Sequence, residues 1–85
     1  MTGAERDAIR GLVKELSAWA LRRETDVHLL NPKVARRVRA RAAELELLLE
    51  EDDGEAMAPR ALAITIAESR ALMEDEAGPP VDGRI

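Results

Sequence analysis

Residues 36–52, RRVRARAAELELLLEED, carry the pattern that decides the predicted fold. Apolar residues recur along this stretch at the spacing of one helical face, which predicts an amphipathic helix with Val38, Ala42, Leu45 and Leu49 toward the core. Four arginines occupy its first half, and every later charge is acidic. This order opposes the helix macrodipole, because a helix begins with partial positive charge and ends with partial negative charge. The charges are therefore expected to serve a contact outside the helix.

The predicted helix spans residues 32–52. Asn31 is a favoured N-cap residue, and Pro32 suits the first helical position because the N–H that it lacks would have no partner there. Gly54 follows the acidic end, as is typical of a helix stop.

The charges of this helix do not stabilise one another. Arg41 follows Arg37 by one turn, and Glu50 follows Glu46, so both pairs repel, and only Arg41 and Glu44 are placed to attract. An antiparallel second copy of the helix would lay acid along base, and two-fold symmetry would repeat the contact. The candidate interface is Trp19, Arg37, Arg39, Arg41, Glu46, Glu50 and Ile64. The alternative is a monomeric bundle with solvated charges and Arg41 at its rim.

Two further helices are expected on either side. A helix at 3–23 is indicated by Thr2 and Glu5, which have the spacing of a capping box before a run of apolar residues at helical spacing. A helix at 58–76 is opened by Pro59. Its sequence ALAITIA also alternates with the period of a strand, but a lone strand would have no partner in the chain, so helix is preferred.

The apolar faces predict which side chains are buried: Leu16, Trp19, Val38, Leu45, Leu62 and Ile66. The segment ETDVHLLNP breaks the helical pattern, and its apolar residues Val27, Leu29 and Leu30 are expected to pack against the core. The helix at 58–76 is apolar on two sides, so it is expected to have two neighbours.

The predicted fold class is all-α, either a small three-helix bundle or a helical hairpin plus a third helix, completed by oligomerisation. Residues 1–77 are expected to form one domain and 78–85 an irregular tail. A chain of 85 residues with no Phe, no Tyr and one Trp builds only a marginal core. A homodimer or a higher even-numbered oligomer is therefore expected.

The sequence indicates a protein without enzymatic activity and without a cofactor. It contains no cysteine, and its single histidine, His28, has no serine, cysteine or consecutive acid at a recognisable catalytic spacing, although Glu24 and Asp26 are close in sequence. Phosphate-binding loops, nucleophile elbows and paired catalytic carboxylates are not found. The acidic run at 50–55 lacks the pattern of a calcium loop and is expected to be a solvated helix end.

The expected location is cytoplasmic, with no membrane partner. No apolar run approaches the ~20 residues of a membrane span, and the first residues lack the apolar region of a secretory signal. Arginine outnumbers lysine 11 to 2, which is typical of a GC-rich coding sequence and indicates a bacterial or phage origin.

The leading functional expectation is a small helical module or regulator that binds proteins and associates with itself through amphipathic helices, as coiled coils do. The alternative is a DNA-associated regulator that uses the arginine-rich start of the helix at 32–52. Nucleic acid is the less favoured partner, because the chain has a net charge of −4 and a pI near 5.0. One feature distinguishes the two functional expectations. DNA binding requires one exposed surface shared by five arginines, namely Arg22, Arg23, Arg36, Arg37 and Arg39.

Overall fold

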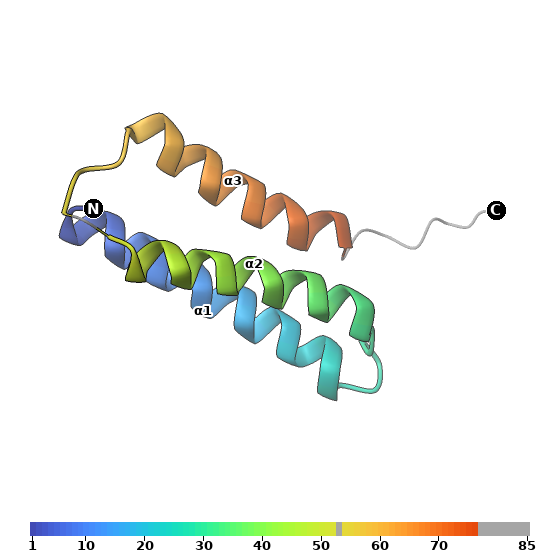
Figure 1. Cartoon of the computed structure of the whole chain (residues 1–85). Helices are drawn as coiled ribbons and strands as arrows, with labels where there is room; N and C mark the ends of the chain where they lie inside the picture. Colours follow the sequence, from blue (N-terminus) through green and yellow to red (C-terminus); the bar gives the residue numbers. More distant parts are fainter. Residues whose placement is uncertain (53, 77–85) are drawn as a thin grey trace.

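The structure is a computed structural model that describes residues 1–52 and 54–76. These residues form three α-helices, which are α1 (Gly3–Thr25), α2 (Pro32–Glu50) and α3 (Pro59–Glu76) (Figure 1). The prediction of an all-α fold with three helices is confirmed, and the strand alternative for ALAITIA is excluded because the segment lies inside α3. The tail predicted at 78–85 lies outside the described residues. None of the three helices is long and apolar enough to cross a membrane.

The predicted N-terminal caps are present. The Thr2 hydroxyl accepts a hydrogen bond from the Glu5 N–H at 3.2 Å, and the Glu5 carboxylate accepts one from the Thr2 N–H at 2.8 Å. The Asn31 side chain accepts a hydrogen bond from the Val34 N–H at 3.4 Å, with Pro32 at the first helical position. Each cap gives a partner to an N–H group that the helix leaves unpaired.

The helix ends differ slightly from the predicted bounds. α1 continues to Thr25 rather than residue 23, because the Asp26 N–H donates to the Arg22 carbonyl at 2.9 Å and closes one more turn. α2 ends at Glu50 rather than residue 52, and Glu51 becomes its C-cap. α3 begins at Pro59 rather than residue 58.

The core lies between α1 and α2, which form an antiparallel hairpin (Figure 1). Leu16, Val38 and Leu45 are buried as predicted, at 0–2% exposure. Small residues among them let the two helix backbones approach closely. The buried cluster is Ile9, Leu12, Leu16, Ala20, Ala35, Val38, Ala42 and Leu45.

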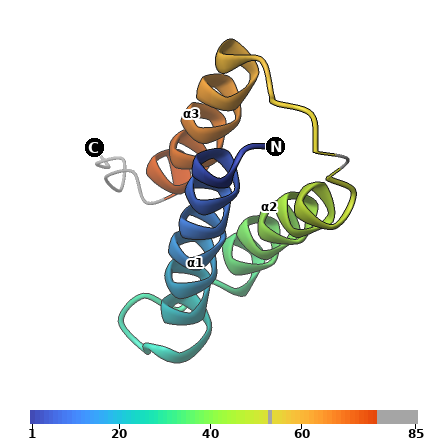
Figure 2. The ribbon, with the colours of Figure 1, turned by 90° about the vertical axis from the view of Figure 1, so that its left-hand side faces the viewer.

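α3 runs in the same direction as α1 and packs less closely on the hairpin (Figures 1 and 2). Its apolar residues Leu62 and Ile66 are only half-buried, and so is Trp19 on α1, so the prediction that these three are buried is wrong in degree. Trp19 and Ile66 line clefts between α1 and α3 that reach solvent, which accounts for their partial exposure. The one fully buried side chain of α3 in the described structure is Ser69.

The loop between α1 and α2 does not pack on the core, contrary to prediction. Val27 is 77% exposed, Leu30 56% and Leu29 40%. The Asn31 N–H donates to the Arg23 carbonyl at 2.8 Å, which draws the ends of the loop together. The end of the core nearest the loop is closed by small side chains of the helices themselves, Ala20 and Ala35, which are fully buried.

Candidate interaction surfaces

Arg39 of α2 pairs with α1 of its own chain. Its guanidinium donates two hydrogen bonds to the Glu24 carboxylate, both at 2.6 Å, in the fork geometry that suits arginine and carboxylate. These hydrogen bonds lower the pKa of Glu24 and raise the pKa of Arg39. Arg39, a predicted interface residue, is therefore already bound within the chain.

Arg41 joins α2 to α3. Its Nε donates to the Ser69 hydroxyl at 3.0 Å, and its terminal nitrogens lie 3.2 Å from Glu44 and 3.6 Å from Glu68. The Ser69 hydroxyl in turn donates to the Thr65 carbonyl at 2.9 Å, so this buried group has partners on both sides. The predicted attraction between Arg41 and Glu44 is confirmed, and Arg41 also contacts Ser69 and Glu68 of α3.

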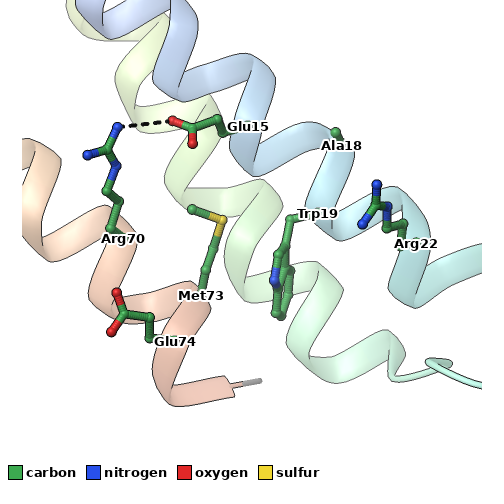
Figure 3. Close-up of a pocket in the computed structure, with 7 residues that line it drawn as sticks. All are labelled: Glu15, Ala18, Trp19, Arg22, Arg70, Met73 and Glu74. Atoms are coloured by element: carbon green, nitrogen blue, oxygen red, sulfur yellow. Dashed lines mark ion pairs between the residues drawn. The ribbon is translucent and has the colours of Figure 1, made fainter. Parts of the chain in front are cut away.

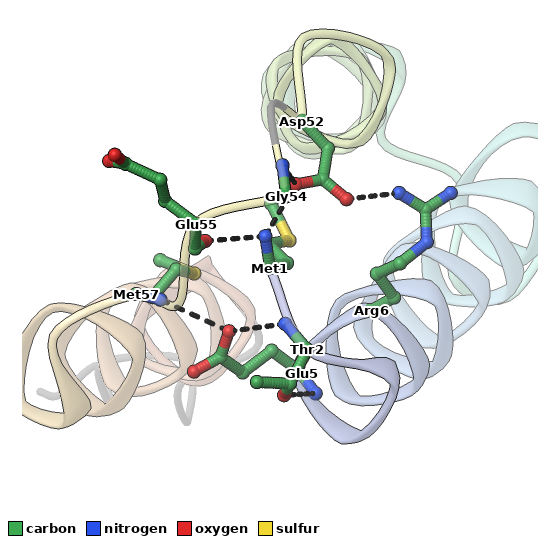
Figure 4. Close-up of polar contacts among 8 residues, drawn as sticks. All are labelled: Met1, Thr2, Glu5, Arg6, Asp52, Gly54, Glu55 and Met57. Atoms are coloured by element: carbon green, nitrogen blue, oxygen red, sulfur yellow. Dashed lines mark hydrogen bonds and ion pairs between the residues drawn. The ribbon is translucent and has the colours of Figure 1, made fainter.

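Asp52, just after α2, binds the start of α1 (Figure 4). Its carboxylate accepts hydrogen bonds from the Met1 amino group, from the Gly54 N–H and from the Arg6 guanidinium. These bonds, that of the amino group foremost, hold the pKa of Asp52 well below its ordinary value. This site is not predictable from the sequence, because Arg6 and Asp52 are 46 positions apart and no local pattern connects them.

Glu5 of α1 binds the connection between α2 and α3 (Figure 4). Its carboxylate accepts hydrogen bonds from the Thr2 N–H and, at 3.1 Å, from the Met57 N–H. The backbone hydrogen bond from Thr2 is the main cause that lowers the pKa of Glu5. The sequence predicted the contact with Thr2 and not the contact with Met57.

Arg36, Arg37, Glu50 and Glu51 lie on the outward face of α2. We call this face the α2 stripe, and all its members are exposed: Arg36, Arg37, Ala40, Ala43, Leu47, Glu50 and Glu51. At about 100° per residue these positions fall within one continuous band of the helix. The stripe is basic at its start and acidic at its end. Its middle is mainly small and apolar, although the exposed Glu44 also falls within this band of the helix. Leu47 is 54% exposed there.

The structure separates the predicted interface residues. Arg37 and Glu50 lie on the α2 stripe, whereas Glu46 is exposed on the flank of α2 that also carries Arg39. Ile64 is 48% exposed on α3. Trp19 faces the space between α1 and α3.

A cleft of about 540 Å³ lies between α1 and α3 (Figure 3). Trp19 and Met73 form its apolar wall, and the Arg23 guanidinium lies 3.9 Å from the centre of the Trp19 ring, in cation–π geometry. Glu15 and Arg70 form an ion pair at 3.5 Å that bridges the two helices. The lining contains both signs of charge, so it favours no particular class of small ligand.

The five arginines of the DNA-binding alternative do not share one surface. Arg23 stacks on Trp19, Arg22 lines the cleft between α1 and α3, and Arg39 is bound to Glu24. Arg36 and Arg37 lie on α2, where they line, with Lys33 and Ala40, a shallow hollow of about 390 Å³. A continuous basic face of the kind that follows a phosphate backbone is therefore not formed by these five residues.

Two further features bear on chemistry. Within residues 1–52 and 54–76, no three His, Asp or Glu side chains are grouped so that they could hold a metal ion. His28 is exposed in the loop between α1 and α2, where its backbone N–H donates to the Asp26 carboxylate at 3.0 Å.

Comparisons of the chain with protein-family models, with curated proteins and with solved structures each gave no significant match.

Proposed function

We propose that this protein is a non-enzymatic interaction module that pairs with a second copy of itself through the α2 stripe. The supporting observation is the separation of opposite charges along one exposed face. Arg36 and Arg37 lie at one end of the stripe, and Glu50 and Glu51 lie at the other. The same face on an antiparallel copy presents the complementary order, as a two-fold interface requires.

The spacing of the stripe residues defines a register. When two α2 helices run antiparallel with their centre between Ala43 and Glu44, Arg36 lies opposite Glu51 and Arg37 lies opposite Glu50. Ala40 then lies opposite Leu47, so the exposed leucine meets a small residue near the centre. Arg39 and Arg41 take no part, since their partners are on α1 and α3 of their own chain.

The energetic expectation is a reversible pair. An exposed ion pair contributes about 0–1 kcal/mol, so four such pairs across the two-fold give at most a modest stabilisation. Burial of Leu47 adds an apolar contribution that salt does not screen.

Charge reversal with rescue tests the proposal. The variant Arg36→Glu/Arg37→Glu sets acid against acid across the two-fold and is expected to dissociate. Adding Glu50→Arg/Glu51→Arg restores the complementary order and is expected to restore association. Sedimentation velocity over a concentration series measures both. The matched control is Arg10→Glu/Arg60→Glu, which makes the same change in charge at two exposed positions outside the stripe.

Three results would contradict the proposal. The first is a wild-type chain that stays monomeric at all concentrations, and the second is a quadruple variant that stays dissociated. The third is a control variant that dissociates as readily as the stripe variant, since net charge rather than the stripe would then govern association.

One observation supports the DNA-associated alternative, namely the hollow lined by Lys33, Arg36 and Arg37. A phosphate could be bound there, but the acidic half of the same stripe would repel the continuing backbone. Salt-sensitive retention of duplex DNA that is lost in Arg36→Ala/Arg37→Ala would favour this alternative over self-pairing.

A further inference from the structure

The loop between α1 and α2 exposes aliphatic side chains to solvent, while its backbone is closed by hydrogen bonds. The Leu29 N–H donates to the Asp26 carbonyl at 2.9 Å, and the Asn31 N–H donates to the Arg23 carbonyl at 2.8 Å. Although the turn is closed, Val27 is 77% exposed and Leu30 is 56% exposed. We call Val27, Leu29 and Leu30 the tip. Exposed apolar side chains that lie close together in sequence on a closed turn form a candidate contact surface.

The charges around the tip are mainly basic, unlike those of the whole chain. Residues 21–39 contain six basic and two acidic side chains, whereas the complete sequence has a net charge of −4. Of the six, Arg39 is bound to Glu24 and Arg36 and Arg37 belong to the α2 stripe, which leaves Arg22, Arg23 and Lys33. Both acids are engaged, because Glu24 binds Arg39 and the Asp26 carboxylate accepts the His28 N–H. Arg22 and Lys33 are exposed where the two helices meet the loop.

We propose that the tip docks on the surface of an anionic lipid bilayer. The aliphatic side chains of the tip enter the interfacial layer, while Arg22 and Lys33 lie beside the lipid phosphates. A bilayer surface offers an apolar phase and negative charge together, which matches the two properties of this end of the molecule. The grooves and phosphates of a nucleic acid would match the cations and leave the tip exposed.

Docking on a bilayer surface differs from spanning a bilayer. The expectation of no membrane partner rests on the absence of an apolar run long enough to span a bilayer, and surface docking needs no such run. The tip also lies outside the α2 stripe, so this inference does not depend on self-pairing. Variants of the tip and variants of the stripe can therefore fail independently.

Vesicle flotation tests the proposal with the full chain. One set of vesicles is phosphatidylcholine alone, and the other contains about 30 mol% phosphatidylglycerol, which supplies the negative surface potential. Wild-type protein is expected to float with the anionic vesicles and to remain behind with the neutral ones. The bound fraction is expected to fall as salt concentration rises, because the cations act through a screened potential.

Two variants separate the apolar and basic contributions. Val27→Ser/Leu30→Ser is expected to abolish flotation, and Lys33→Gln is expected to lower the partition coefficient on anionic vesicles roughly five-fold, as the loss of one cation at the surface implies. Ile64→Ser and Arg60→Gln make the same kinds of change at exposed positions on α3 and are expected to bind like wild type. Circular dichroism of each variant establishes that the helices are retained.

The proposal is overturned if wild-type protein does not float with anionic vesicles, whether or not it binds duplex DNA. It is also overturned if the serine variant floats as wild type does, because the tip would then have no role. Equal losses in the α3 control variants would mean that general charge or hydrophobicity, rather than this end of the molecule, governs binding.

Discussion

At the scale of single residues, two leucines of α2 show how position decides the role of a side chain. Leu45 is 2% exposed in the core between α1 and α2, whereas Leu47, two positions later, is 54% exposed on the α2 stripe. The helical period of about 3.6 residues places them on opposite sides of the helix. The first stabilises the fold, and the second is free to contact another surface.

Leu45→Ala is expected to lower the free energy of unfolding by about 2–5 kcal/mol, because it leaves a cavity in a closely packed core. Leu21→Ala is the matched control, since Leu21 is 51% exposed on α1, and it is expected to change stability by about 0.5 kcal/mol or less. Urea denaturation of both variants measures the difference. Equal losses would show that the core is not centred on Leu45.

The lowered pKa of Asp52 implies that the stability of the fold depends on pH. Because hydrogen bonds lower its pKa in the folded chain, Asp52 stabilises the fold at pH values above its ordinary pKa, and this stabilisation is lost as pH falls through the folded pKa. Asp52→Asn is therefore expected to lower the melting temperature at pH 7 and to have a smaller effect below about pH 3. Thermal melts followed by circular dichroism test this. An equal difference in melting temperature between wild type and variant at both pH values would contradict this prediction.

At the scale of elements, the hairpin and α3 differ in how they are held. α1 and α2 share nearly all of the buried apolar side chains, whereas α3 is attached by half-buried residues, by Arg41 and by the Glu15–Arg70 ion pair. Elements with few buried contacts open at lower free energy than the core. We therefore expect α3 to be the first helix to separate.

Hydrogen exchange followed by mass spectrometry tests the attachment of α3. Its amides are expected to exchange faster than those of the hairpin in the wild-type chain. Arg41→Ala is expected to accelerate exchange in α3 further while leaving α1 nearly unchanged, because it removes the donor to the buried Ser69 hydroxyl. Arg60→Ala, an exposed arginine at the start of α3, is the control. Uniform acceleration across all helices would mean that the three unfold as one unit.

At the scale of the whole molecule, charge is distributed along the hairpin rather than around it. The end with the loop between α1 and α2 is mainly basic, and the opposite end carries Glu50, Glu51 and Asp52. Some of these charges are paired within the chain, because Asp52 binds Arg6 and Arg39 binds Glu24, both on α1. The α2 stripe carries further charges of both signs on an exposed face, which is the face that we propose to pair with an oppositely directed copy.

Association through the stripe is expected to weaken with salt. The proposed ion pairs are exposed, so raising the ionic strength from about 0.05 M to about 0.5 M should raise the dissociation constant by screening them. Sedimentation equilibrium at both salt concentrations measures the change. Association that strengthens with salt would show that apolar contacts, and not the charge order, hold the copies together.

The sequence by itself determined the three helices and the residues at the centre of the hairpin. Caps and helical spacing act over a few residues, so Thr2, Asn31 and Pro59 located the helix starts to within one residue. The core positions Leu16, Val38 and Leu45 followed from the same periodicity. The predicted self-pairing of Arg37 with acidic partners also began as a sequence observation, and it stays a prediction.

Only the tertiary structure decided which charges are used inside the chain. Arg39 and Arg41 on α2, and Asp52 just after it, have the same local context as the like charges beside them, yet they bind groups that lie 15, 28 and 46 positions away. Such pairs depend on how the helices cross, which periodicity does not specify. The exposure of Val27 and Leu30 has a similar origin, because alanines on both helices close the core before the loop is reached. Local patterns determine which face of a helix is apolar, and packing determines which neighbour that face meets.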